Sequence, residues 1–390
     1  MVGKEAPAAR LTMATTREID LERLGERLLA APGFVEVRDA ALRSDAEAYV
    51  VGGAVRDALL GDRPTNLDLV VVGDPLPLAE ALGGELRAHE RFGTVVVTLA
   101  DRIVDVARAR AESYEHPGAL PTVRPAGLEQ DLARRDFTIN ALAVSLADPG
   151  AVVDTRGGVD DLRAGVIRVL HERSFVDDPT RALRAARYAA RLGFSVEPRT
   201  LELLRVADLS TVSGERVAAE LGKLAAEPDP RRGFELLAQW GLIALDPKSG
   251  ELIDRVGELV EREPWAGVVA RPVAVLVASR GPTPEARALA ALEPARPSVA
   301  VDAAQGRATT ELLLARALGA AWIDRYLAEW RGVALEMSGE DLIAAGIPQG
   351  PAIGRGLAAA LRAKLDGEVE DRDGELRVAL EAARAPSDGG

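Results

Sequence analysis

The sequence of 390 residues contains no cysteine, so disulfides, thiolate metal sites and cysteine nucleophiles are all excluded. Its only histidines are His89, His116 and His171, and they form no His-Asp pair of the phosphohydrolase type. Aromatic residues make up 4% of the chain, while alanine, leucine and arginine are plentiful, which favours helices. No apolar run approaches the ~18 residues of a membrane span, and the N-terminal segment lacks the apolar stretch of a signal peptide. We therefore expect a cytoplasmic protein without membrane contact.

Lysine is also scarce, since four of the 48 basic residues are lysine and the rest are arginine. Arginine suits bidentate recognition of phosphates and base edges, although genomic codon bias would give the same ratio. The net charge of −13 argues against a protein that coats nucleic acid, but it leaves room for a local basic face. With 47% hydrophobic and 28% charged residues the chain has the composition of a globular protein. Its length predicts two to three domains.

Residues 49–74 are the most informative stretch of the chain. A short apolar run ends at Gly52 and Gly53, a helical segment follows, and a second apolar strand spans Leu67–Val72. Two glycines between a strand and a helix let the backbone approach a ligand closely, and the helix start suits a phosphate. Side chains two apart on a strand share one face, so Asn66 and Asp68 are expected to point the same way. A divalent metal would sit there in phosphoryl transfer.

The segments GGAVRDALLG and LDLVVVGD resemble the signature of class II CCA-adding enzymes and bacterial poly(A) polymerases. These are template-independent nucleotidyltransferases of the polymerase-beta superfamily that act on tRNA or RNA 3′ ends. The resemblance implies that Gly52, Gly53 and Arg56 bind nucleotide and that Asp68 and Asn66 are catalytic and hold Mg²⁺. The family has an aspartate where this chain has Asn66. An amide oxygen can still bind a hard cation, but it brings no negative charge, so metal affinity and nucleophile activation should fall.

A further acid, Asp105, lies between Val104 and Val106 in an apolar run. Burying an unpaired acid there would cost several kcal/mol. Either Asp105 is an end residue that faces a loop, or it is a third carboxylate of the metal site. The family often has an aspartate in this Asp-x-Ala-x-x-Arg-x-Glu context, so the resemblance favours the metal site.

The segment RRDFTINALA nearly repeats motif B of the same family. The second arginine of that motif contacts the incoming nucleotide, which implies this role for Arg135. Taken alone, the residues Arg134, Arg135 and Asp136 are equally consistent with a helix cap or a salt bridge, with apolar neighbours such as Phe137 packing inward.

An arginine-rich helix is predicted after Asp178, which precedes a proline and is expected to be the N-cap. Arg181, Arg184, Arg187 and Arg191 follow at spacings of three, three and four, which places them along one side of the helix. A solvated charged face is one interpretation of this pattern. The other comes from the resemblance of the segment to motif D of the family, which selects the nucleotide.

That resemblance implies that Asp178 and Arg181 recognise the base and that Arg184 and Arg187 face the triphosphate. Cytosine and adenine both present an acceptor ring nitrogen beside an amino donor. An aspartate can accept from the amino group while an arginine donates to the ring nitrogen. Uracil and guanine present the opposite order, so the same pair rejects them.

We expect an α+β protein with a small mixed-sheet nucleotidyltransferase head and helical domains after it. The expected parts are an N-terminal tail and helix (1–45), the head (46–170), a nucleotide-selecting neck (171–245), a helical body (246–334) and a helical tRNA-binding tail (335–390). Within them, we expect disorder at 1–16 and 385–390, a helix at 19–31, a helix after Pro75 that stops near Gly83 and Gly84, a loop at 113–127, and a linker or helix junction at 295–306. The turn GIPQGPAIG is similar to a helix-hairpin-helix that presents backbone N–H groups to an RNA phosphate.

The function that these observations predict is template-independent addition of C and/or A nucleotides to the 3′ end of tRNA from CTP or ATP with Mg²⁺. Partial specificity is an open alternative, namely addition of CC only, of A only, or of poly(A). Because of Asn66, a weak catalyst and a nucleotide- or tRNA-binding protein without transfer also stay open, as does a non-catalytic helical RNA-binding protein. The sequence does not decide the oligomeric state.

Overall fold

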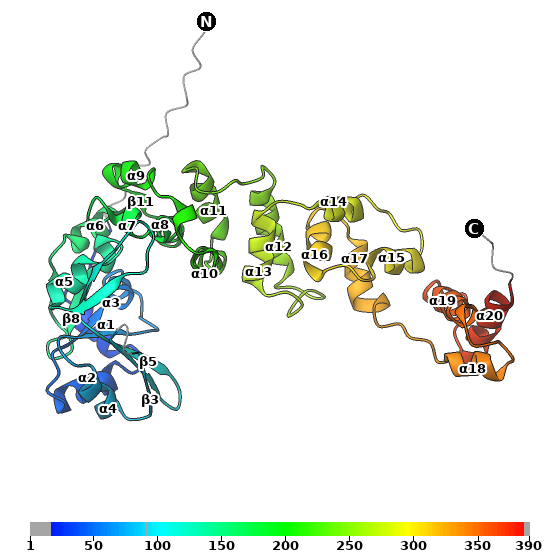
Figure 1. The fold of residues 1–390 in the computed structure, drawn as a ribbon, viewed down its shortest axis with the longest axis horizontal. Helices are drawn as coiled ribbons and strands as arrows, with labels where there is room; N and C mark the ends of the chain where they lie inside the picture. Colours follow the sequence, from blue (N-terminus) through cyan, green and yellow to red (C-terminus); the bar gives the residue numbers. More distant parts are fainter. Residues whose placement is uncertain (1–16, 90–92, 386–390) are drawn as a thin grey trace, which may run out of the picture. The chain divides into compact units, whose positions relative to one another are not determined.

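The computed structural model describes residues 17–89 and 93–385 and divides into two compact units, with the boundary after Ile243 (Figure 1). The disorder expected at residues 1–16 and 386–390 concerns segments outside the described residues. Among the described residues, no helix combines the length and the apolar character that crossing a membrane requires. The division into two units is coarser than the five parts expected from the sequence, whose finer boundaries stay predictions.

A seven-stranded sheet forms the centre of the first unit, in the order β3-β4-β5-β2-β1-β8-β9. Its strands are β1 (Ala48–Val51), β2 (Asp68–Val71), β3 (Glu85–His89), β4 (Thr94–Thr98), β5 (Ile103–Arg108), β8 (Leu142–Ser145) and β9 (Val152–Asp154). β2 and β5 run parallel and the other neighbours are antiparallel, so the predicted mixed sheet is confirmed. Two small ladders accompany it, β6 (Arg110–Ser113) with β7 (Thr122–Pro125) and β10 (Val166–Ile167) with β11 (Ser195–Val196).

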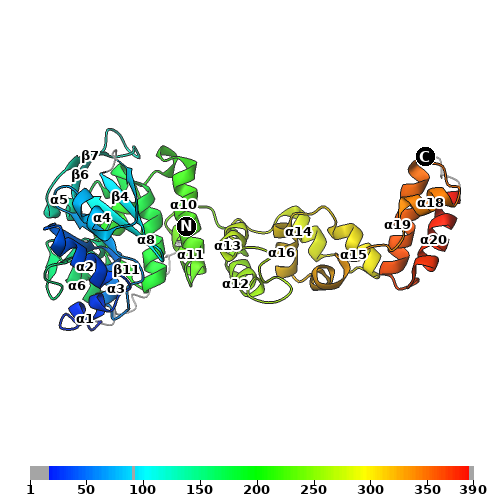
Figure 2. The same cartoon turned by 90° about the horizontal axis from the view of Figure 1, so that it is seen from below.

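Helices cover one face of this sheet near its β3 edge. The first helices are α1 (Leu24–Leu29), α2 (Phe34–Arg43), α3 (Gly53–Leu59) and α4 (Leu76–Leu82). Buried valines alternate with more exposed residues along β4 and β5, as expected for strands that cover a core with one face only. These valines share a core with Phe34 of α2 and Leu78 of α4, and Figure 2 shows α4 beside β4. The opposite face of β3, β4 and β5 is open, since Ile103 is 68% exposed there.

The rest of the first unit is mainly helical. Its helices are α5 (Leu128–Ala133), η2 (Thr138–Asn140), α6 (Gly158–Ala164), α7 (Ser174–Asp177), α8 (Thr180–Leu192), α9 (Pro198–Leu204), η3 (Leu209–Thr211), α10 (Gly214–Ala225) and α11 (Pro230–Gln239). Ser213 caps α10 by accepting the backbone N–H of Arg216. α8 packs against α10 and α11, so these helices fix the side of α8 from which its arginines project.

The second unit is all helical over its described residues. Its helices are α12 (Ser249–Leu259), α13 (Arg271–Ser279), α14 (Pro284–Ala290), α15 (Pro297–Ala304), α16 (Thr309–Ala317), α17 (Trp322–Arg325), the π-helical turn η4 (Tyr326–Trp330), α18 (Gly339–Ala344), α19 (Pro351–Leu365) and α20 (Arg372–Arg384). α14, α15 and α19 begin at a proline, whose missing N–H costs nothing in the first turn. α18, α19 and α20 share a small core of their own. The predicted α+β class, with a mixed-sheet part followed by helices, is confirmed.

The helix stop predicted near Gly83 and Gly84 is confirmed, because both glycines adopt positive φ and α4 ends at Leu82. The edge strand β3 that follows it was not predicted. Three local predictions were wrong. The expected loop at 113–127 contains one strand of the β6–β7 hairpin. The expected linker at 295–306 contains helix α15, which starts at Pro297. The helix expected at 19–31 is confined to α1 (Leu24–Leu29).

Candidate functional site

One cavity of about 430 Å³ in the first unit collects most of the site residues that the sequence predicts. The end of β1, the start of β2 and the first turns of α8 all contribute to its wall. The predicted residues in this wall are Gly52, Gly53, Asp68, Arg135, Asp178, Arg181 and Arg184. The cavity therefore joins all three sequence motifs, which lie far apart along the chain.

The glycine turn after β1 lets an arginine approach the backbone. Gly52 has φ +69°, in the left-handed region that favours glycine. A Cβ atom at this position would lie 3.1 Å from Nη1 of Arg135. The backbone N–H of Gly52 donates to the carbonyl of Leu142 in β8 at 2.9 Å, which holds the turn against the sheet. The glycine and the arginine of two separate motifs thus form one continuous part of the wall.

Two carboxylates lie side by side on neighbouring strands. Asp68 begins β2 and is the register partner of Asp105 in the parallel strand β5. Paired residues of adjacent strands share a face, with their backbones about 4.8 Å apart. Both residues are exposed on that face, and Asp105 lies within β5 rather than at an end that faces a loop.

The electrostatics of this pair suit a cation. Partial burial raises the pKa of Asp68, the charge of Arg135 lowers it and the charge of Asp105 raises it again, and the net effect is a raised pKa. The two like charges therefore repel each other, and a hard divalent cation would relieve the repulsion. Carboxylate oxygens are the ligands that Mg²⁺ takes in proteins, so the donor set fits this ion.

Asn66 does not share the strand that holds Asp68. It lies exposed in a bend, two residues before β2 begins. Strand alternation therefore does not decide whether Asn66 and Asp68 share a face, and the expected alignment of the two side chains stays a prediction. Among the described residues, no group of three or more His, Cys, Asp or Glu side chains is close enough to hold a metal ion. The candidate magnesium site therefore rests on two carboxylates, Asp68 and Asp105, which are register partners.

Arg135 is held in the wall by a buried acid. Its Nη2 donates to Asp131 at 2.9 Å, and Asp131 also accepts from Nη2 and Nε of Arg134 at 2.8 and 3.0 Å. Burial by itself raises the pKa of Asp131, but the charges of Arg134 and Arg135 outweigh burial and leave it lowered. The salt bridge considered for this motif is therefore present, and the same salt bridge orients Arg135 at the cavity.

Arg184 makes a comparable pair with Asp136. Its Nε and Nη2 donate to Oδ2 of Asp136 at 2.8 and 2.6 Å. Burial raises the pKa of Asp136, yet the charge of Arg184 and the hydrogen bonds from Asn140 and Arg184 hold it at about 2. The nearby Asp136 in turn raises the pKa of Arg184, which stays charged. Arg184 thus brings a fixed positive group to the wall.

Among the described residues, one oxygen of Asp178 has hydrogen-bond partners and the other has none. Its Oδ1 accepts from the backbone N–H and the hydroxyl of Thr180, at 3.1 and 2.6 Å, and from Nη2 of Arg216 at 2.9 Å. No described residue donates to its Oδ2. The helix begins at Thr180, so Pro179 occupies the cap position predicted for Asp178, although Asp178 still accepts from the first turn. Arg216 lies outside the three sequence motifs, so its contact with Asp178 was not predicted.

Arg181 is fixed from several sides. Its Nη1 donates to Oγ of Ser174 and its Nη2 to the carbonyl of Arg134, both at 2.8 Å. The hydroxyl of Tyr114 is 3.5 Å from Nη2, and Nε2 of His171 is 3.4 Å from Nη1. Burial and then the charge of Arg181 lower the pKa of His171. No hydrogen bond or ion pair joins Arg181 to Asp178, so both remain available to a ligand.

Arg56 and Arg187 lie behind the cavity wall, which corrects the expectation that they contact nucleotide. Arg56 is 2% exposed and donates to Asp57 at 2.7 Å and to Oδ1 of Asn140 at 2.6 Å. Arg187 is also buried and pairs with Glu227 at 3.3 Å. Both guanidinium groups stack on the ring of Tyr188, at 5.1 and 4.5 Å. Both support the wall: the packing of α8 on α10 turns Arg187 inward, and Asp57 and Asn140 hold Arg56 of α3 behind the wall.

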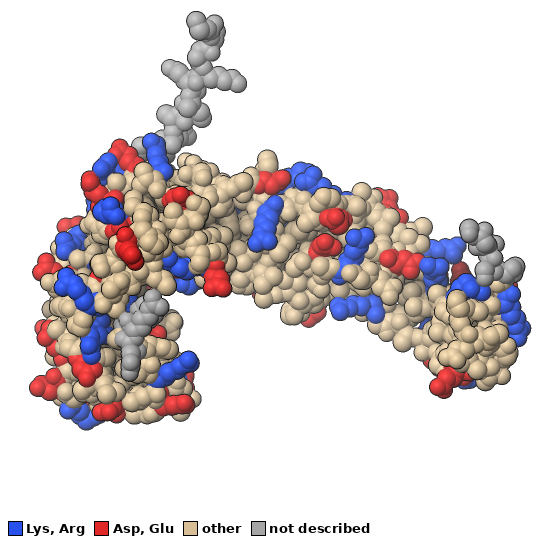
Figure 3. All heavy atoms as spheres, in the orientation of Figure 1, with Lys and Arg blue, Asp and Glu red and all other residues tan. Residues whose placement is uncertain are grey.

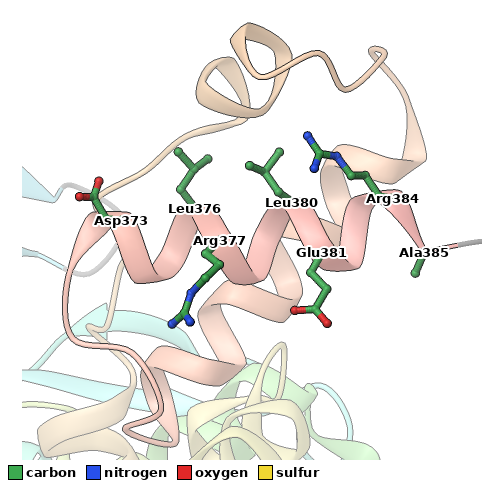
Figure 4. Close-up of a pocket in the computed structure, with 7 residues that line it drawn as sticks. All are labelled: Asp373, Leu376, Arg377, Leu380, Glu381, Arg384 and Ala385. Carbon is green, nitrogen blue, oxygen red and sulfur yellow. The ribbon is translucent and has the colours of Figure 1, made fainter.

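Outside this cavity, basic and acidic side chains are interspersed over much of the face shown in Figure 3, and basic ones gather over the last two helices. A shallow hollow follows α20 in the second unit (Figure 4). Leu376, Leu380 and Arg384 project from one side of this helix, and Arg377 and Glu381 project from the other. No predicted catalytic or nucleotide-binding residue lies in this hollow.

Comparisons with known proteins agree with this geometry. The family model "Poly A polymerase head domain" matches residues 48–168, and the model "Probable RNA and SrmB- binding site of polymerase A" matches residues 193–245. The CC-adding tRNA nucleotidyltransferase of Deinococcus radiodurans is 38% identical, over 87% of this chain and 90% of that protein.

Two other similar proteins differ in how much of their length is covered. The A-adding tRNA nucleotidyltransferase of Geobacter sulfurreducens is 31% identical over 94% of this chain, which spans about half (49%) of that longer protein. The solved structure of the Thermotoga maritima CCA-adding enzyme complexed with tRNA matches with a TM-score of 0.72 at 29% identity, covering 92% of this chain and 98% of that one.

Proposed function

This chain belongs to the family of tRNA nucleotidyltransferases and poly(A) polymerases, and we propose that it adds C or A nucleotides from CTP or ATP to the 3′ end of tRNA without a template. The observation that carries the proposal is the single cavity whose wall unites Asp68 with Arg135, Asp178 and Arg181. In the proposed reaction the 3′ hydroxyl releases its proton to solvent and its oxygen bonds to the α-phosphorus of the nucleotide. The bond from that phosphorus to the bridging oxygen breaks, and pyrophosphate leaves.

Base selection is assigned to Asp178 and Arg181. The free Oδ2 of Asp178 is available to accept from the amino group of cytosine or adenine, because Thr180 and Arg216 occupy only Oδ1. Arg181 is fixed by Ser174 and by the carbonyl of Arg134, which places a donor beside that acceptor. A preorganised pair discriminates strongly because a wrong base leaves buried polar groups without partners.

Phosphate binding is assigned to the glycine turn and the two fixed arginines. Arg135 lies against Gly52, and Arg184 stays charged beside Asp136. Both guanidinium groups keep N–H donors near the wall, so they can neutralise and orient a triphosphate. In phosphoryl transfer such positioning and charge neutralisation supply most of the catalysis.

We assign Mg²⁺ binding to Asp68 and Asp105, with Asn66 as a neutral ligand beside them. The ion, when bound, would neutralise charge on the triphosphate and lower the pKa of the attacking hydroxyl. Asp68 and Asp105 are adjacent and exposed on one face of the sheet, which supports an active enzyme despite the asparagine. A weak catalyst, or a protein that binds tRNA without transfer, remains the alternative that the asparagine suggests.

The tRNA itself is assigned to the helical part of the chain, with the tail as one contact. α18 and α19 are joined by a turn that contains Gly346 and Gly350, both with positive φ, and such turns can present backbone N–H groups to phosphate. The domain boundaries 1–45, 46–170, 171–245, 246–334 and 335–390 and the cytoplasmic location belong to the same proposal.

The deciding experiment is a nucleotide-addition assay. Purified protein is incubated with Mg²⁺, with tRNA that lacks its 3′ terminus, and with labelled CTP or ATP, each alone and then together. We expect incorporation of at least one label, and the pattern identifies CC, A or CCA addition. Long homopolymeric products would instead identify a poly(A) polymerase. Retention of tRNA on the protein without incorporation would contradict the transferase and support a binding protein.

A further inference from the structure

One row of residues crosses the open face of the sheet and links the candidate metal carboxylates to an arginine at the sheet edge. Asp68 of β2 pairs with Asp105 of β5, Asp105 pairs with Val96 of β4, and Val96 pairs with Arg87 of β3. Register partners project to the same side of a sheet. With strands about 4.8 Å apart, the Cα atom of Arg87 lies about 10 Å from that of Asp105 and about 14 Å from that of Asp68.

Residues on this face of β3 are exposed in the described part of the chain, and no described residue is a partner of Arg87 there. All five residues of β3 are exposed. The structure gives Arg87 no hydrogen bond or ion pair with a described residue, whereas the neighbouring Arg102 and Arg108 pair with Glu36 and Asp74. Glu85 projects to the same side two positions earlier, yet it makes no ion pair with Arg87.

The nucleotide cavity lies on the other side of Asp68. Its wall includes Gly52 after β1, which is the neighbour of β2 opposite to β5, and it continues to Arg181 of α8. In an in-line displacement the attacking oxygen and the leaving group occupy opposite sides of the phosphorus. When a nucleotide occupies the cavity, the side of Asp68 formed by β5, β4 and β3 stays open. The RNA that carries the attacking hydroxyl can therefore bind on that side.

We propose that the open face of β3, β4 and β5 receives the single-stranded 3′ end of the RNA and that Arg87 binds one of its last backbone phosphates. The proposal rests on the proposed function, because it needs an RNA end as the acceptor. An exposed arginine without a protein partner offers a bidentate donor pair to a phosphate. A phosphate contact positions the strand without reading its sequence, so Arg87 acts on any tRNA.

The first test compares Arg87→Ala and Arg87→Lys with a matched control, Arg205→Ala. Arg205 is an exposed arginine of the same unit with no side-chain bond or ion pair to a described residue. The probe is an acceptor-stem minihelix that lacks its last nucleotides. We expect Arg87→Ala to raise the Kd of the minihelix about 5-fold and to reduce the salt slope of log K by about 0.7, the value for one single-strand phosphate. Arg87→Lys should keep the slope, because it keeps the charge, and Arg205→Ala should change neither quantity.

A second test locates the phosphate. In a series of minihelices, one phosphate at a time near the 3′ end is replaced by an uncharged methylphosphonate. We expect one position to weaken binding to the unaltered protein and to have no further effect on Arg87→Ala, because the two changes remove the same contact. Equal losses for Arg87→Ala and Arg205→Ala, or additive losses at every position, would overturn the assignment.

Failure of this inference is distinguishable from failure of the proposed function. Calorimetry with CTP and ATP reports the cavity alone, and Arg87→Ala should leave both Kd values unchanged. If neither nucleotide binds the unaltered protein, the proposed function fails. If nucleotides bind and are added while Arg87→Ala has normal RNA affinity and a normal salt slope, only the role of Arg87 is contradicted.

Discussion

The two units each contain a carboxylate with no exposed surface, and they hold it in different ways. Asp131 in the first unit pairs with Arg134 and Arg135. Glu375 in the second unit accepts from Lys364 at 2.6 Å and from the backbone N–H groups of Glu336 and Met337. In both cases burial raises the pKa of the acid and the donors outweigh it, so the net pKa is lowered.

The difference between them lies in where the cations face. Arg135 is paired on one side and lines the nucleotide cavity on the other. Lys364 joins two helices of the tail and lines no described cavity. A buried ion pair that is fully enclosed thus serves only to hold the fold together. A buried ion pair with one partner open to a cavity also preorganises a binding site. Substitutions in these two ion pairs should therefore separate effects on nucleotide binding from effects on stability.

The largest expected effect is the loss of activity in Asp68→Asn. Removing this carboxylate from the candidate metal site should abolish nucleotide addition, by about 10³-fold or more. The pKa of Asp68 is raised in the folded protein, so its charge is unfavourable there at neutral pH, and the variant should unfold at an equal or slightly higher temperature. Addition assays and thermal unfolding measure the two effects. Full nucleotide addition by this variant would contradict the metal assignment.

The second prediction concerns the buried acids themselves. Asp131→Asn leaves two arginines without their acid and should lower the free energy of unfolding by about 3 kcal/mol. It should also weaken CTP and ATP binding, because Arg135 loses its orientation. Glu375→Gln should destabilise less, because Lys364 can turn toward solvent, and it should leave nucleotide binding unchanged. Denaturant unfolding and calorimetry on both variants provide the check, and weaker nucleotide binding by Glu375→Gln would contradict the contrast.

The third prediction is a dependence of stability on pH. Asp136 has a pKa of about 2 in the folded protein, below the ordinary 3.8 of an aspartate. A lowered pKa means that the stabilisation is fully present above about 3.8 and is lost as the pH falls toward 2. The amount is about 2 kcal/mol. The difference in unfolding free energy between the unaltered protein and Asp136→Asn, followed from pH 6 to pH 2, should shrink by that amount. A constant difference would contradict the strong pairing of Asp136 with Arg184.

Much of the fold could be predicted because most strands of the central sheet coincide with short apolar runs in the sequence. β1, β2, β4 and β5 coincide with such runs, and the glycines after β1 indicated the turn that forms part of the cavity. The strand β3 could not be found in this way. Its five residues, ELRAH, do alternate polar and apolar positions, but the run is short, all of it is exposed, and Leu86 and Ala88 are its only apolar residues, so the pattern is too weak to indicate a strand.

The site was partly predictable for a similar reason. Regular spacing along α8 identified Arg181, Arg184 and Arg187 as one face, but spacing cannot tell which of them meets a cavity. The packing of α10 decides this, since Glu220 and Glu227 enclose Arg187 and leave Arg184 at the wall. Arg216 was missed because its contact with Asp178 joins residues 38 positions apart, and no local pattern encodes such a contact.

The smallest expected effect tests the asparagine that departs from the family pattern. Asn66→Asp adds a negative charge near Asp68, so it should tighten Mg²⁺ binding and raise turnover a few-fold or leave it unchanged. The bend that holds Asn66 is exposed, so folding should not suffer. Measuring turnover across a Mg²⁺ titration gives both the Mg²⁺ affinity and the maximal turnover. The comparison variant is Asp105→Asn, which removes a charge from the neighbouring strand. If Asn66→Asp lowers turnover and Asp105→Asn is inactive, the active metal site consists of Asp68 and Asp105 alone. If Asp105→Asn is fully active, the second ligand must come from the bend instead, and the in-register pair would be a feature of the sheet rather than of the chemistry.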